Sequence, residues 1–114
     1  MARTSRQTYG GRRAASRAAD AVAKLPVNSV APAITGTATQ GQTLSLSTGT
    51  WSNTPDAYQR IWKRNGVVIA GATGATYVLT LADVGAVISG TVIATNLGVS
   101  AVANSNSTSA VAAA

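Results

Sequence analysis

The chain has 114 residues and contains no cysteine and no histidine. Its only acids are Asp20, Asp56 and Asp83, set against nine Lys and Arg, which gives a net charge of +6. The composition excludes the usual zinc sites, haem ligands and thiol or histidine catalysts. Three widely spaced aspartates also argue against a carboxylate dyad or a calcium loop. We therefore expect one non-enzymatic domain that acts by binding, with no catalytic residue, metal or cofactor.

The positive charge is concentrated at the N-terminus. Residues 1–24 hold six Arg and Lys and a single Asp, a net charge of +5, whereas residues 25–114 hold three Arg and Lys and two Asp, a net charge of +1. The rest of the chain is rich in Ala, Gly, Val, Ser and Thr. The sequence therefore divides into a basic N-terminal arm, residues 1–26, and a domain over residues 27–114.

The arm has two parts. Residues 1–11 are polar and basic and end in a Gly pair, which predicts an extended segment that cannot order on its own. Residues 12–25 have strong helix propensity, with an apolar stripe that includes Val22 and Leu25, and Pro26 ends any helix before it. A helix of this length is marginal in water without a surface to dock on.

We expect the arm to bind a partner. It uses Arg five times and Lys once, and Arg makes forked contacts with carboxylate or phosphate groups that Lys does not. The alternatives are a solvated basic tail and a mitochondrial-type presequence, while the charges within residues 12–24 argue against a secretory signal. No transmembrane segment is present. The candidate partner-binding residues are Arg3, Arg6, Tyr9, Arg12, Arg13, Arg17, Val22 and Leu25.

From Val27 onward, short runs of β-forming residues are separated by turn residues. In Thr43–Ser47, leucines alternate with hydroxyl residues, the pattern of a half-buried strand. Asn65-Gly66 predicts a type I′ hairpin turn, because both positions need a positive φ. About seven such strands predict an all-β, two-sheet antiparallel sandwich. The runs are Ala33–Ala38, Thr43–Thr48, Tyr58–Arg64, Val67–Ile69, Thr76–Leu81, Val87–Thr95 and Val99–Asn104.

Five segments, in order along the chain, are similar to one known family. They read P-x-I-x-G-x-A-x-x-G-Q-x-L over 32–44, G-T-W over 49–51, W-K-R-N-G over 62–66, A-G-A-T-x-x-T-Y-x-L-T-x-A-D-V-G over 70–85 and V-x-A-T-N-x-G over 92–98. Over about residues 30–112 the chain resembles the bacterial and phage immunoglobulin-like repeats. Such repeats occur in large surface proteins and as appendages on virion proteins of tailed phages.

The resemblance assigns structural roles to several residues. It implies that Trp62 is the buried core Trp of the third strand, in a sandwich that has no disulfide. It also implies that Asp83 bonds local backbone in the turn before the sixth strand, and that Gly85 takes a conformation other residues avoid. Tyr77 and Leu79 would face the core.

Two positions depart from the family pattern, which usually has an aromatic residue two positions before the core Trp and Gln just before it. Arg60 shares a face with Trp62, so its stem should pack inside while its charged head reaches the rim. Ile61 and Lys63 share the opposite face and form a candidate domain interface, although a single exposed Ile is ordinary. We expect Trp51 to cover one end of the core.

The resemblance and the basic arm together favour a virion structural protein of a tailed phage, a decoration or cementing protein on the capsid surface. Its expected partner is the major capsid protein or another virion protein, with many copies per particle and possible contacts between neighbouring copies, and no membrane. One alternative is a cell-surface or host-recognition module that binds glycans. The other is a virion protein that binds nucleic acid through the arm.

Overall fold

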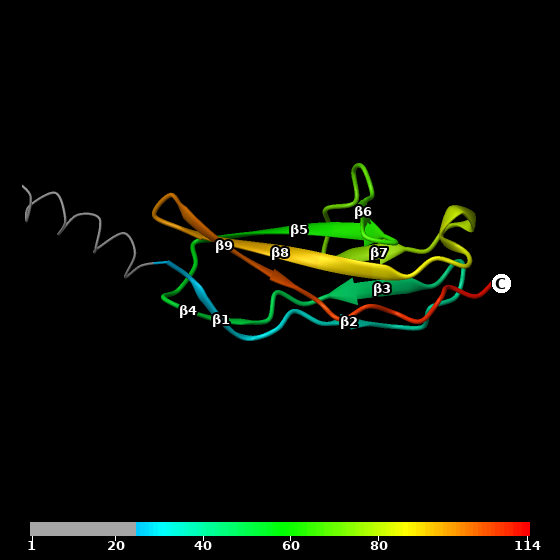
Figure 1. The fold of residues 1–114 in the computed structure, drawn as a ribbon, viewed down its shortest axis with the longest axis horizontal. Coiled ribbons are helices and arrows are strands. Elements are labelled where there is room, and N and C mark those ends of the chain that lie inside the picture. The colour runs from blue at the N-terminus through cyan, green and yellow to red at the C-terminus, as the bar shows by residue number, and fades with distance from the viewer. Residues whose placement is uncertain (1–24) are drawn as a thin grey trace, which may run out of the picture.

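The computed structural model describes residues 25–114, which form strands joined by turns and one short 3₁₀ helix (Figure 1). The predicted extended segment and the predicted helix over residues 12–25 lie outside the described residues. The exception is Leu25, which lies in a bend. The described part of the chain holds no helix with the length and hydrophobicity that a membrane span requires.

Nine strands and the 3₁₀ helix η1 follow one another along residues 27–104. In chain order they are β1 (Val27–Val30), β2 (Ile34–Thr35), β3 (Thr43–Leu46), β4 (Thr50–Ser52), β5 (Ala57–Arg64), β6 (Val67–Val68), β7 (Thr76–Val78), η1 (Leu81–Asp83), β8 (Ile88–Asn96) and β9 (Val99–Asn104).

These strands form three antiparallel sheets. One sheet has the order β2-β3-β7 and a second has the order β6-β5-β8-β9. β1 and β4 form a two-stranded ribbon at the end of the domain where residue 25 enters (Figure 1). The predicted all-β class with antiparallel sheets is confirmed.

One hydrophobic core lies between the three-stranded and the four-stranded sheet. Leu44 and Leu46 on β3 contribute to it from one side, and Trp62 on β5 with Ile88 and Val92 on β8 from the other, all of them buried. Burying one such side chain stabilises the fold by about 1.5–3 kcal/mol. The alternation of Leu44 and Leu46 with exposed neighbours agrees with the sequence pattern.

The two sheets approach each other closely at Gly90, which is paired with Trp62 in the register of β5 and β8. A Cβ atom added to Gly90 would lie 2.6 Å from Cδ2 of Leu46, a contact that real Cβ atoms essentially never make. Because Leu46 is itself buried, it has little room to move away. Glycine at this position therefore lets the leucine of one sheet pack against the backbone of the other.

The observed strands differ from the predicted ones in extent and number. The run predicted over Ala33–Ala38 pairs only at Ile34–Thr35, and the run predicted over Thr76–Leu81 ends at Val78 because η1 follows. β1 and β4 were not predicted. Their residues are mostly exposed and their register is irregular between Asn28 and Val30, so no alternating apolar pattern marks them.

The predicted hairpin turn between β5 and β6 is confirmed. Asn65 has a φ of 50° and Gly66 a φ of 81°, the combination that a type I′ turn needs. The Asn65 side chain adds a contact outside the hairpin, because its Oδ1 accepts a hydrogen bond from the backbone N–H of Val87 at 3.0 Å. The turn is thereby tied to the segment that leads into β8.

The C-terminal segment after β9 closes one side of the domain. The backbone N–H of Ser105 donates to the carbonyl of Gly90, and that of Ala112 donates to the carbonyl of Ala38. Between them, Asn106 Oδ1 accepts a hydrogen bond from the backbone N–H of Ile34 at 2.8 Å. Val111 is buried in the core. The segment therefore crosses from the four-stranded sheet to the three-stranded one.

Candidate functional site

Among the described residues, the largest group of interacting titratable side chains surrounds the carboxylate of Asp83. Arg64 Nε donates to Oδ1 at 2.6 Å and forms an ion pair with it. The hydroxyl of Tyr77 donates to Oδ2 at 2.7 Å, and the backbone N–H of Thr80 donates to the same oxygen at 2.8 Å. The cluster joins β5 of one sheet to β7 of the other through η1.

The surroundings of Asp83 shift the pKa values in the cluster. Burial by itself would raise the pKa of Asp83, but the hydrogen bonds from Thr80, Tyr77 and Arg64 outweigh it and leave this pKa lowered. The pKa of Tyr77 is raised, first by burial and then by the neighbouring carboxylate. The pKa of Arg64 is raised, chiefly by its hydrogen bond to Asp83. All three shifts hold the cluster in its ion-paired form at neutral pH.

This cluster is built to hold the fold together. Asp83 is completely buried, so a ligand could reach its carboxylate only by displacing a protein donor. The bond from the Thr80 N–H confirms the prediction that Asp83 bonds local backbone. Gly85, two residues on, has a φ of 84°, as expected for this turn. The Arg64 partner was not predicted, because nothing local connects residues 19 positions apart.

Trp62 and Tyr77 form the aromatic part of the core. Trp62 is completely buried, which confirms its predicted place, and its ring stacks on that of Tyr77 with centroids 5.5 Å apart. Its indole N–H donates to the carbonyl of Gly74 at 2.8 Å. Leu79 is also buried, whereas Tyr77 is partly exposed. These side chains are used for packing.

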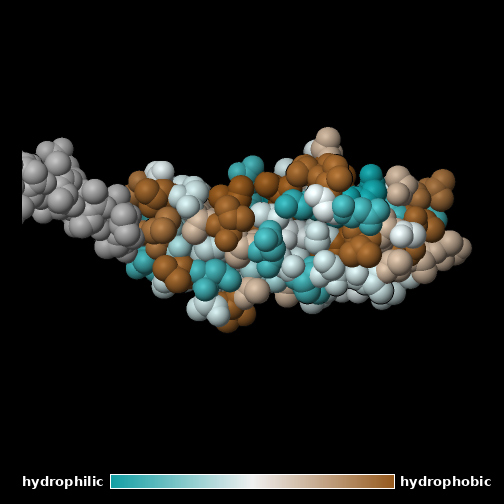
Figure 2. Space-filling model, in the orientation of Figure 1, coloured by the Kyte–Doolittle hydropathy of each residue, from teal (hydrophilic) through white to brown (hydrophobic). Residues whose placement is uncertain are grey.

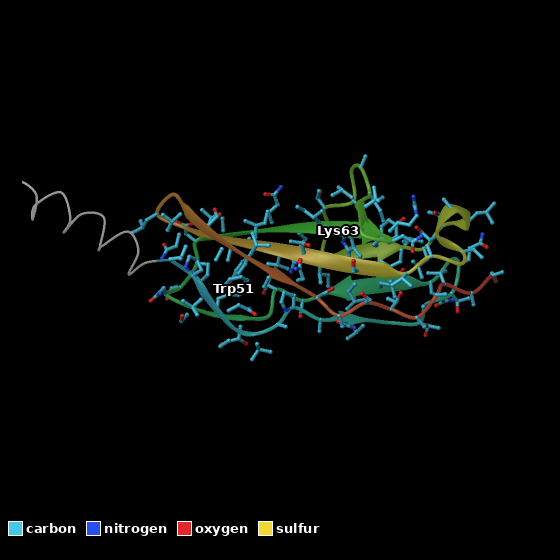
Figure 3. The ribbon with its side chains drawn as sticks, in the orientation of Figure 1. Trp51 and Lys63 are labelled. Carbon is cyan, nitrogen blue, oxygen red and sulfur yellow. The ribbon has the colours of Figure 1, made fainter. Side chains whose placement is uncertain are left out.

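The candidate interface residues Ile61 and Lys63 lie on the face of β5 opposite to Trp62. In the register with β8, Ile61 is paired with Thr91 and Lys63 with Ser89. Both side chains are half-buried. Figure 3 shows Lys63 on β5 near the β6 hairpin, whereas Trp51 lies toward the other end of the domain, where it packs against the core. Arg60 faces inward and its Nε donates to the carbonyl of Leu46 at 2.9 Å.

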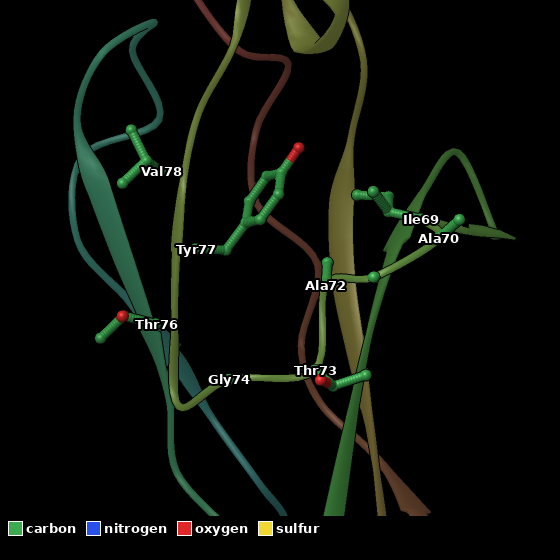
Figure 4. Close-up of a pocket in the computed structure, with 9 residues that line it drawn as sticks. Ile69, Ala70, Ala72, Thr73, Gly74, Thr76, Tyr77 and Val78 are labelled. Atoms are coloured by element: carbon green, nitrogen blue, oxygen red, sulfur yellow. The ribbon is translucent and has the colours of Figure 1, made fainter.

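An open cavity of about 330 Å³ lies between the β6–β7 connection and β7. Figure 4 shows the Tyr77 ring pointing into it toward Ala72 and Ile69, whereas Thr76 and Val78 point to the other side of β7. The lining carries no charged side chain. It therefore offers no side chain that could form an ion pair with a charged ligand.

A second open groove, of about 470 Å³, lies at the end of the domain where residue 25 enters. It is lined by Asn53, Thr54, Asn96 and Leu97. Three of these four residues, all except Asn96, have a positive φ although none is glycine. The sequence analysis did not predict this groove. A signal for it lies in Asn96-Leu97-Gly98, where an apolar Leu stands at a turn position that usually holds Asn, Asp or Gly.

Other predicted features lie partly beyond the described residues. Arg3, Arg6, Tyr9, Arg12, Arg13, Arg17 and Val22 are outside them, and of the arm's candidate contacts only Leu25 is described. Within residues 25–114, no three His, Cys, Asp or Glu side chains come together as metal ligands would. Comparison of the chain with family models, with curated proteins and with solved structures gives no match.

Proposed function

We propose that residues 27–114 form an immunoglobulin-like sandwich. The strand orders β2-β3-β7 and β6-β5-β8-β9 support this, since an immunoglobulin-type sandwich also splits its first, second and fifth strands from its third, sixth and seventh. The buried Trp62 on β5 supports it further, because it occupies the place of the core Trp on the third strand of such domains. Within this domain, β1 and β4 are additions at one end.

On this basis the protein is a non-enzymatic virion protein of a tailed phage, a capsid decoration protein. Its basic arm attaches it to a capsid protein, and its domain is displayed outside. The observation that carries the proposal is that most of the positive charge lies in the arm and little of it on the domain. Residues 1–24 hold a net charge of +5, whereas two of the domain's three cations, Arg60 and Arg64, are bonded inside it.

Attachment follows from the chemistry of the arm. Its five guanidinium groups pair with carboxylates on the capsid subunits, each as a charge-assisted, forked hydrogen bond. The apolar stripe ending at Leu25 adds burial that salt does not screen. Ordering the arm costs free energy, which the contacts made on the capsid offset. A capsid presents many identical sites, so many copies of the chain can bind one particle.

The test is co-sedimentation with capsids assembled in a host that lacks the gene for this chain. Three proteins are compared: the full chain, a chain without residues 1–24, and a full chain with Arg3, Arg6, Arg12, Arg13 and Arg17 all replaced by Gln. We expect the full chain to sediment with the capsids and both variants to stay in solution, with unchanged far-ultraviolet circular dichroism from the domain. Added salt should weaken binding only in part.

Two results would contradict the proposal. If the shortened chain binds capsids as well as the full chain, the arm is a passive tail and the face with Ile61 and Lys63 becomes the candidate attachment site. If the full chain does not bind capsids but binds a short DNA duplex, with an affinity that falls steeply as the salt concentration rises, the nucleic-acid alternative is correct.

A further inference from the structure

The end of the domain that joins the arm is held together by a short chain of hydrogen bonds. We call it the arm-proximal end and define it by Leu25, Val27, Asn53, Asn96 and Leu97. The Asn53 side-chain amide donates to the carbonyl of Leu25 at 2.8 Å, and the amide of Asn96 donates to the carbonyl of Asn53 at 2.7 Å. The point at which the arm leaves the domain is therefore fixed against the turn between β8 and β9.

Leu97 is an unexpected residue at the tip of that turn. With a φ of 52° it is followed by Gly98 with a φ of 81°, so both central residues of this hairpin turn are left-handed. Asn, Asp and Gly suit the first of these positions, whereas Leu adopts it at a cost in strain. The Leu97 side chain is also 66% exposed to water. Neither the turn nor the core explains why leucine is there.

Leu97 is accompanied by other apolar surface at the same end. Val27, two residues after Leu25, is 56% exposed. The open groove beside Leu97 is lined otherwise by uncharged polar residues. Figure 2 shows hydrophobic surface gathered at this end, next to the point where the arm begins. The arm-proximal end therefore presents an apolar tip with one carboxylate beside it, because Oδ2 of Asp56 accepts a hydrogen bond from the backbone N–H of Leu97 at 3.4 Å.

We propose that Leu97 and the arm-proximal end form a second contact with the same capsid subunit that the arm binds. The inference rests on the proposed function, and continuity of the chain argues for this occupant. Val22 and Leu25 are three residues apart in the sequence. A subunit surface that binds Val22 is therefore separated from Leu25 by at most about 11 Å of chain. Once the arm is bound, the apolar tip is held next to that subunit at a high effective concentration.

The subunit surface that meets Leu97 is apolar. The acidic groups of the subunit lie on the neighbouring surface that binds the arm. At Leu97 they would find no cation in the lining of the groove, and the carboxylate of Asp56 would repel them. The domain is then held upright on its arm by burial of Leu97, and its outer end, which carries η1, points away from the capsid. The arm supplies attachment and Leu97 fixes the orientation.

The test compares two substitutions in the full-length chain. Leu97→Asn places the favoured residue in the turn, so the melting temperature should stay the same or rise. Leu81→Asn is the matched control, since Leu81 is 73% exposed in η1 at the opposite end of the domain (Figure 1). Binding is measured on the capsids that lack this chain. We expect Leu97→Asn to weaken apparent affinity about tenfold, while Leu81→Asn binds like the natural chain.

The inference is overturned if Leu97→Asn binds capsids like the natural chain, or if Leu81→Asn weakens binding as much. The chain with five Arg→Gln substitutions, measured beside them, separates this inference from the proposed function. If that chain still binds and Leu97→Asn does not, attachment by the arm is refuted while the contact at Leu97 stands. If only the Arg→Gln chain loses binding, the arm stands and the contact at Leu97 is refuted.

Discussion

Replacing Asp83 with Asn removes the charge from the buried cluster while keeping the shape of the side chain. Asn offers one acceptor oxygen where Asp offers two. If that oxygen accepts the bonds from Thr80 and Tyr77, the amide NH₂ of the new residue faces the Nε of Arg64, donor against donor. The ion pair between β5 and η1 is then lost, and the connection between the two sheets is weakened.

The expected loss in the free energy of unfolding at neutral pH is about 2–4 kcal/mol. Hydrogen bonds to charged groups contribute about 1.5–3 kcal/mol each. Because Asp83 is fully buried, water cannot replace the hydrogen bonds that the substitution removes. The Arg64 side chain is 33% exposed, which lets water stabilise the freed guanidinium and keeps the total below that of a fully buried pair. The total free energy of unfolding of a domain of this size is about 5–15 kcal/mol.

The same substitution should remove a pH dependence. The pKa of Asp83 is lowered in the folded state, so its contribution is present above the pKa of the unfolded chain, about 3.9. That contribution is lost as the pH falls from about 4 through the folded pKa. The natural chain should therefore lose stability in acid, and the Asp83→Asn chain should lose much less over the same range.

Urea unfolding followed by circular dichroism, repeated from neutral pH down to strongly acid pH, measures both effects. Asp56→Asn is the control, because Asp56 is exposed and its oxygen makes only a 3.4 Å contact with the N–H of Leu97. We expect this control to follow the natural chain. An Asp83→Asn chain as stable as the natural one at neutral pH, with the same acid dependence, would refute the reasoning.

Two further predictions concern the core and the hairpin. Trp62→Ala empties the space between the sheets and removes the hydrogen bond to Gly74, so it should lower the free energy of unfolding by about 3–5 kcal/mol. A loss below about 1 kcal/mol, measured by urea unfolding, would show that Trp62 does not fill the core. Gly66→Val forces a β-branched residue to a φ of 81° and should lower the melting temperature far more than Val67→Thr at an exposed position. Equal melting temperatures for these two variants would contradict the turn assignment.

The amino-acid sequence determined the features that depend on neighbouring residues. The alternation in Thr43–Ser47 sets which side chains of β3 face inward, and Asn65-Gly66 specifies its own turn through the φ values it tolerates. Trp62 is the bulkiest side chain of the predicted run Tyr58–Arg64, and the resemblance of its W-K-R-N-G segment to the immunoglobulin-like repeats predicted its place in the core. The position of Asp83 three residues after Thr80 similarly allows its bond to the backbone there.

Only the tertiary structure decided the features that join distant segments. The pairing of β1 with β4, the partner of Asp83 on β5 and the path of the C-terminal segment between the two sheets all connect residues without a local pattern. The groove at Leu97 likewise depends on how Asn53 and Asn96 meet across the fold. The physical reason is that periodicity and turn chemistry act within a few residues of the chain. Which distant segments pair depends on the packing free energy of the whole domain.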